Sequence, residues 1–87
     1  MNKEEVKNEF KAHLITYLNL LDITTDQIKD DEPLFGGDLG LDSIDSVELI
    51  VLLDREYGIK IKNPTEGRQI LIDVNTIVDY IVLNRTK

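Results

Sequence analysis

The chain has 87 residues, of which 41% are hydrophobic, so we expect one folded domain over residues 1–87 with a single core. Its 17 acidic and 10 basic side chains give a net charge of −7, which argues against nucleic-acid or anionic-membrane binding. It has no cysteine and one histidine, His13, which excludes disulfides, thiolate sites and paired imidazoles. Because no secretory signal or membrane-spanning apolar run is evident, we expect a soluble, cytoplasmic protein.

Two long helices are predicted from hydrophobic periodicity and capping residues. The first covers about residues 3–21, with Asn2 as its N-cap. Its apolar residues recur on one helical face: Val6, Phe10, Leu14, Tyr17, Leu18 and Leu21. The second covers residues 43–57, between Asp42 as N-cap and Gly58 as the residue that ends the helix.

The rest of the chain predicts an extended link, a short helix and a third long helix. Residues 58–62 alternate like a strand but have no partner strand, and Asn63-Pro64-Thr65-Glu66 is typical of a helix start. The last helix is expected from Asp73, as its N-cap, to about Asn84. Residues 22–42 form a long loop whose apolar residues predict that it packs onto the protein. The predicted fold class is all-α, a small up-down bundle of three main helices plus one short helix.

The negative charge is concentrated in one segment, residues 22–45, which hold eight acidic side chains and one lysine. A solvated loop and a docking surface for basic partners both explain such a run. The second helix raises a related alternative, because it has two apolar faces. One face is expected to meet the core, and it holds Ser46, Leu49, Ile50, Leu53 and Tyr57. The other either packs under the long loop or meets a partner, and it holds Ile44, Val47 and Val51.

Ser43 is the obvious reactive hydroxyl, but the residues around it do not predict an enzyme. The glycines that flank a hydrolase serine are absent, and His13 is the only imidazole that could serve as a base. No metal site is expected either, because the calcium-loop-like start at Asp22 lacks the required glycine and the closing glutamate. Ser43 instead suits modification by another enzyme, since the start of a helix favours an anionic ester while the nearby aspartates oppose it.

The residues around Ser43 also form a family motif. Residues 37–49 read Gly-Asp-Leu-Gly-Leu-Asp-Ser-Ile-Asp-Ser-Val-Glu-Leu. This run resembles the acyl carrier protein signature, in which Asp-Ser-Leu lies within Asp-Leu-Gly-x-Asp-Ser-Leu-Asp-x-Val-Glu-Leu. The similarity continues at Asp54, at Glu56 and through residues 57–61, and it resumes at residues 78–81. The length, the acidity and the helix order agree with it. The resemblance therefore covers nearly the whole chain.

The resemblance implies a carrier that is not itself an enzyme. In this family a phosphopantetheinyl transferase esterifies the motif serine, here Ser43, with the 4′-phosphopantetheine of coenzyme A. The thiol of that group holds acyl chains as thioesters, and the carrier presents them to acyl-transfer, condensing and reducing enzymes with basic docking patches. The second helix is the family's recognition helix. Matching positions assign partner contact to Asp42, Ile44, Asp45, Val47, Glu48, Val51, Asp54 and Glu56.

Fatty acid biosynthesis is the function that the resemblance favours, and we expect the carrier to be a monomer. Several positions depart from the family pattern. Leu41 stands where fatty-acid carriers commonly have alanine, Ile44 replaces the usual leucine, and Arg55 and Arg68 interrupt the acidic surface. These departures keep open the alternative that the chain is a discrete carrier of a specialised polyketide or aryl-polyene-type pathway. A different class of protein, an acidic interaction module that is never modified, is the competing interpretation.

Overall fold

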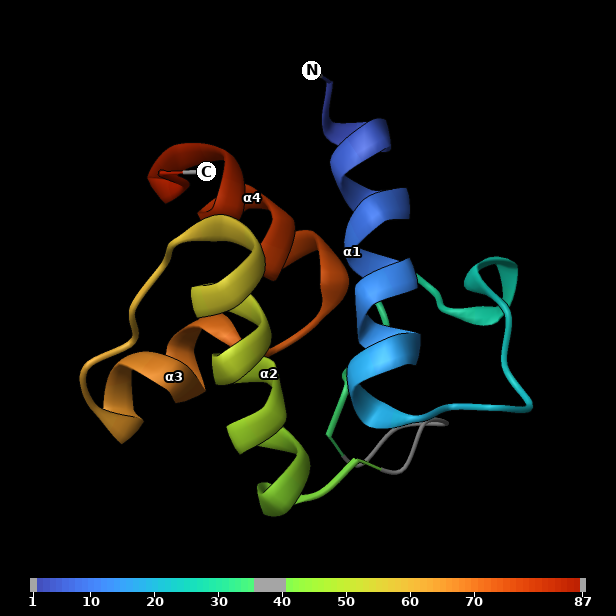
Figure 1. The fold of residues 1–87 in the computed structure, drawn as a ribbon, viewed down its shortest axis with the longest axis horizontal. Coiled ribbons are helices and arrows are strands. Elements are labelled where there is room, and N and C mark those ends of the chain that lie inside the picture. The colour runs from blue at the N-terminus through green and yellow to red at the C-terminus, as the bar shows by residue number, and fades with distance from the viewer. Residues whose placement is uncertain (1, 36–40, 87) are drawn as a thin grey trace.

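The computed structural model describes residues 2–35 and 41–86, the side chains of Ser43, Pro64 and Arg68 excepted. These residues form four α-helices and one 3₁₀ turn, and no strand is present among them (Figure 1). The elements are α1 (Lys3–Leu18), η1 (Thr25–Gln27), α2 (Ser43–Tyr57), α3 (Pro64–Ile70) and α4 (Val74–Asn84). The prediction of an all-α fold with three main helices and one short helix is confirmed.

The helix starts lie where the capping residues predicted them. Asn2, Asp42, Asn63 and Asp73 each precede a helix, and each side chain accepts a hydrogen bond from a backbone N–H of the first turn. These bonds pair amide groups that have no partner inside the helix. Gly58 ends α2 in the left-handed conformation, with φ of 67°, as its position predicted.

The predicted end of the first helix was wrong by three residues. Asn19 adopts the left-handed conformation, with φ of 55°, and its N–H donates to the carbonyl of Ile15, which ends α1 at Leu18. Leu21 was expected on the buried face and is instead 83% exposed. Asparagine tolerates this conformation better than other residues with a side chain, so it can end a helix in place of glycine.

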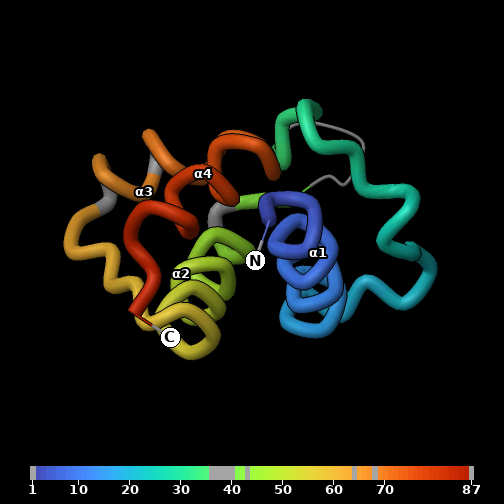
Figure 2. The backbone as a smooth tube through the Cα atoms, turned by 90° about the horizontal axis from the view of Figure 1, so that it is seen from above, coloured from blue at the N-terminus to red at the C-terminus, as the bar shows by residue number. Residues whose placement is uncertain are grey.

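Helix α1 packs against both α2 and α4, and α3 packs against α4. In Figure 2, α1 and α2 are seen nearly end-on. The buried apolar residues form one cluster to which the helices and the α1–α2 loop both contribute. Its fully buried members include Phe10, Leu14, Leu34, Leu49, Leu52, Leu53, Tyr57, Val74, Ile77, Val78 and Ile81.

The prediction that the long loop packs onto the protein is confirmed for its described part. Ile28 and Leu34 are buried, and the Leu34 N–H donates to the carbonyl of Ile72 at 2.9 Å. Asp30 accepts a hydrogen bond from Asn75 N–H through its main-chain carbonyl, at 3.0 Å. The Asp30 carboxylate also lies 3.2 Å from Lys7 Nζ and 2.5 Å from Lys11 Nζ. The motif residues of the segment 36–40, including the acidic Asp38, lie outside the described residues.

Candidate functional site

The start of α2 is held by a reciprocal pair of aspartates. Asp42 Oδ1 accepts hydrogen bonds from Ile44 N–H at 2.9 Å and from Asp45 N–H at 3.2 Å. Asp45 Oδ2 in turn accepts one from Asp42 N–H at 3.0 Å, which completes a capping box. Ser43 is thereby fixed as the first residue of the helix.

The capping box changes what the helix start offers to an added anion. Two amide groups of the first turn already bind the Asp42 carboxylate, so they are not available to a phosphate ester on Ser43. The expected support from the helix start is therefore smaller than the sequence suggested. Because Asp42 and Ile44 are both exposed, the backbone around Ser43 nevertheless lies where another protein can reach it.

The second apolar face of α2 lies open in the structure. Ile44 is 74% exposed and Val47 is 58% exposed, while Val51 is half-buried. The described part of the loop, residues 22–35 and 41–42, leaves Ile44 and Val47 exposed, which favours the alternative that these residues meet a partner. The opposite face holds Leu49, Leu53 and Tyr57, which are buried as predicted, and also Leu52, which the sequence did not assign to a face.

The acidic residues predicted to contact partners lie in three different environments. Asp42, Glu48 and Asp54 are exposed, whereas Asp45 is half-buried and takes part in the capping box. Glu56 differs from all of these because its carboxylate turns toward α1. It accepts a hydrogen bond from the Tyr17 hydroxyl at 2.8 Å, and His13 Nε2 lies 3.6 Å from its other oxygen. This hydrogen bond raises the pKa of Tyr17 above its usual value.

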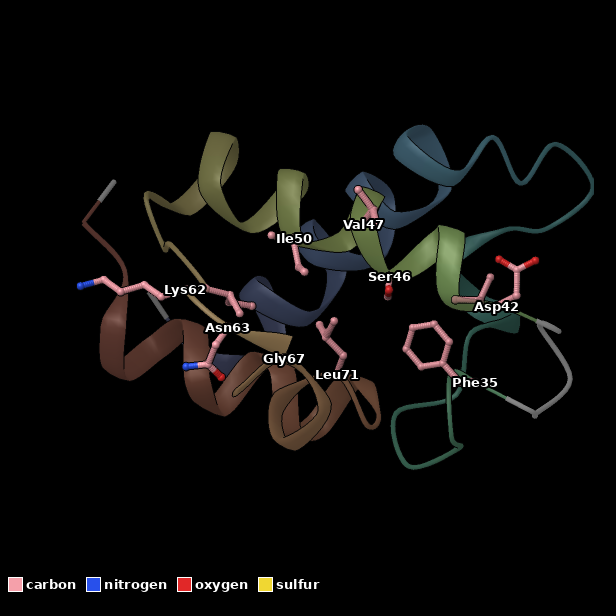
Figure 3. Close-up of a pocket in the computed structure, with 11 residues that line it drawn as sticks. Phe35, Asp42, Ser46, Val47, Ile50, Lys62, Asn63, Gly67 and Leu71 are labelled. Carbon is pink, nitrogen blue, oxygen red and sulfur yellow. The ribbon is translucent and has the colours of Figure 1, made fainter. Parts of the chain in front are cut away.

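A pocket with a volume of about 760 Å³ lies alongside α2, bounded on the other side by α3 and the link that precedes it (Figure 3). Its walls are mainly apolar, with Phe35, Leu41, Val47, Ile50, Ile61 and Leu71 among the residues that line it. Asp42, Ser46, Lys62, Asn63 and Gly67 complete the lining. Asp42 also places the start of α2 at the edge of this pocket. The residue patterns alone did not predict this pocket, because its walls come from four separate segments of the chain.

Phe35 and Leu41 bound the end of the pocket that lies nearest to the start of α2. Their backbones pair in an isolated bridge, and Leu41 is only 7% exposed although it directly precedes the exposed cap Asp42. Phe35 in turn follows Leu34, whose N–H is bonded to the α3–α4 turn. The described part of the loop therefore positions both the pocket wall and the first residue of α2.

The four helices and the capped helix that begins at Ser43 agree with the class that the sequence motif suggested, a phosphopantetheine attachment domain. The family described as "Phosphopantetheine attachment site" matches residues 17–65. A protein from Chlorobium phaeobacteroides named "Acyl carrier protein" is 42% identical over 82 residues, covering 94% of this chain and 97% of its own. Proteins of the same name from Chloroherpeton thalassium and Thermosynechococcus vestitus are 37% and 36% identical, covering at least 93% of each chain. The chain belongs to the acyl carrier protein family.

Family membership defines the general role of the chain. It is a carrier and not an enzyme, and its attachment domain carries covalently bound 4′-phosphopantetheine. Members of the family interact with enzymes and with acyl chains. Within residues 2–35 and 41–86, no helix is long and apolar enough to cross a membrane.

Proposed function

We propose that Ser43 is the residue that carries 4′-phosphopantetheine. The position of Ser43 is the observation that supports this proposal, because Ser43 is the serine of the family motif and the first residue of α2. Its neighbours Asp42 and Ile44 are exposed, and Asp42 borders the apolar pocket. When bound, the group supplies a thiol on which acyl chains are held as thioesters, which a chain without cysteine cannot provide itself.

The outer face of α2 is the proposed docking surface for the enzymes that modify and use the carrier. Ile44 and Val47 supply exposed apolar contacts, and Asp42 and Glu48 supply negative charge beside them. An apolar centre with charges at its rim is typical of protein interfaces, and the charges speed the encounter with a basic partner. The partners are then a phosphopantetheinyl transferase and acyl-transfer, condensing and reducing enzymes with basic docking patches.

We propose that the pocket beside α2 receives the acyl chain. Its largely apolar lining matches a hydrocarbon chain, and burial contributes about 0.8 kcal/mol for each methylene group removed from water. Fatty acid biosynthesis is the pathway that this arrangement and the family favour. One observation supports the alternative of a specialised pathway: Leu41 fills part of the pocket wall, at the position where fatty-acid carriers commonly have alanine.

Monomeric state and a cytoplasmic location are part of the same proposal. A surface that engages several enzymes in turn must be free between encounters, which favours a monomer. Coenzyme A, the donor of the prosthetic group, and the acyl-transfer enzymes are available in the cytoplasm. Size-exclusion chromatography with light scattering measures the first point, and a stable dimer that covers α2 would contradict it.

The attachment site is tested by co-expression with a phosphopantetheinyl transferase and intact-protein mass spectrometry. We expect the wild-type chain to gain the mass of 4′-phosphopantetheine and Ser43→Ala to gain nothing. Ser46→Ala is the matched control, because Ser46 lies one turn further along α2 and should leave the modification intact. An increment that survives Ser43→Ala, or its absence from the wild-type chain with several transferases, would overturn the proposal and favour an unmodified interaction module.

A further inference from the structure

The link between α2 and α3 presents two lysines on its outer side. Ile59 is buried and Ile61 is half-buried against the core, whereas Lys60 and Lys62 are exposed. Because side chains of an extended segment alternate in direction, both lysines lie on the side away from the core. Neither lysine forms an ion pair with any residue of the described parts of the chain, 2–35 and 41–86.

One of these lysines, Lys62, borders the same pocket as the acidic start of α2, and Lys60 lies two residues before it in the exposed link. Lys62 lines the pocket together with Asp42, and Figure 3 places the two side chains at opposite ends of it, with Val47 and Ile50 between them. Helix α2 has 15 residues, which corresponds to a length of about 22 Å. The start of α2 near Ser43 therefore holds acidic side chains, whereas at the far end of the surface two positive charges lie in the link that follows the exposed Asp54.

Stabilisation of the helix does not explain why these two lysines are present. Cations stabilise a helix when they lie in its last turn, but Lys60 and Lys62 follow Gly58, the residue that ends α2. A net charge of −7 already favours solubility, and two lysines reduce it. Partner recognition gives these charges a role, because unpaired charges at the rim of an interface select the partner that complements them.

We propose that Lys60 and Lys62 form a second, basic contact of the docking surface. The complementary partner is an enzyme that presents basic side chains to Asp42 and Glu48 and a carboxylate to the lysines. A partner with a uniformly basic docking patch is repelled at this end of the surface. This inference rests on the proposed function, because it assigns partner choice to the same face of α2.

The probe is a phosphopantetheinyl transferase whose docking patch is uniformly basic. We expect the double variant Lys60→Glu/Lys62→Glu to be modified at Ser43 about threefold to tenfold faster, in kcat/KM at low ionic strength, than the wild-type chain. The gain should shrink in about 0.5 M salt, where the screening length falls well below 10 Å. The control Lys3→Glu/Lys29→Glu changes the net charge equally at exposed lysines outside the pocket lining and should stay within about twofold of wild type.

If both double variants gain equally in rate, the effect comes from net charge and the inference is overturned. An unchanged or lower rate in Lys60→Glu/Lys62→Glu would also overturn it. The proposed attraction between the lysines and a partner carboxylate is tested with single Lys→Glu or Arg→Glu variants around the docking patch of the transferase. At least one should prefer the wild-type chain over Lys60→Glu/Lys62→Glu, and a scan without any such reversal would contradict the proposed contact. Failure of the proposed function is distinguishable, because the wild-type chain would then gain no mass at Ser43.

Discussion

Asp42 combines two roles that a pair of substitutions can separate. Its carboxylate accepts two hydrogen bonds from the first turn of α2, and its negative charge belongs to the proposed docking surface. Asp42→Ala removes both the cap and the charge, and loss of such a cap costs about 1 kcal/mol, within a range of about 0.5–2. For a domain of this size, that corresponds to a fall in Tm of about 4–8 °C.

Asp42→Asn should keep the cap and remove only the charge. Asparagine is as good an N-cap as aspartate, so the amide oxygen can still accept from the N–H groups of Ile44 and Asp45. The substitution removes the favourable interaction between the negative charge and the helix start, which lowers stability. It also removes the repulsion between the Asp42 and Asp45 carboxylates, which offsets that loss. We therefore expect Asp42→Asn to unfold within about 2 °C of the wild-type chain.

The assays are thermal unfolding followed by circular dichroism, and transferase kinetics followed by intact-protein mass spectrometry. Both variants should be modified more slowly than wild type at low salt, because both lack the charge. Asp73 provides the matched control, since it caps α4 through Thr76 N–H at 2.7 Å and does not line the pocket beside α2. Asp73→Ala should lower Tm by a comparable amount and leave the modification rate near that of wild type.

Two results would refute this reasoning. If Asp42→Asn unfolds at the temperature of Asp42→Ala, the stability comes from the charge and not from the capping hydrogen bonds. If Asp42→Asn is modified as fast as wild type, the charge does not contribute to docking.

Two further substitutions test the loop and the pocket. Lys11 holds the pKa of Asp30 below its usual value, so this stabilisation is complete above about pH 4 and is lost as the pH falls further. Asp30→Asn should thus lower the urea midpoint at neutral pH but not in strong acid, and a difference that persisted there would contradict a charge-based role. Leu41→Ala should destabilise the unacylated carrier by about 2–3 kcal/mol and enlarge the pocket, so that a long acyl chain raises its Tm more than that of wild type. Equal rises would show that Leu41 does not limit the pocket.

The helix starts were predictable because each depends on a capping side chain and amide groups within three residues of it. The end of α1 was not, since hydrophobic periodicity continues to Leu21 while the helix ends at the left-handed Asn19. The motif around Ser43 pointed to the start of α2. The pocket could not be predicted from the residue patterns, because it requires Phe35, Ile61 and Leu71 to meet across long sequence separations.

The inner face of α2 contributes to stability and its outer face is the proposed docking surface, and Glu56 is the one residue that does not fit this division. Leu49, Leu53 and Tyr57 are fully buried on the inner face, so large changes there act on folding. Ile44 and Val47 are exposed on the outer face, so changes there should act on docking with little effect on stability. Glu56 was assigned to partner contact, but its carboxylate binds Tyr17, so its reversal would disturb the α1–α2 contact as well. The exposed Asp54 is therefore the better position at which to measure the contribution of acidic charge near the end of α2.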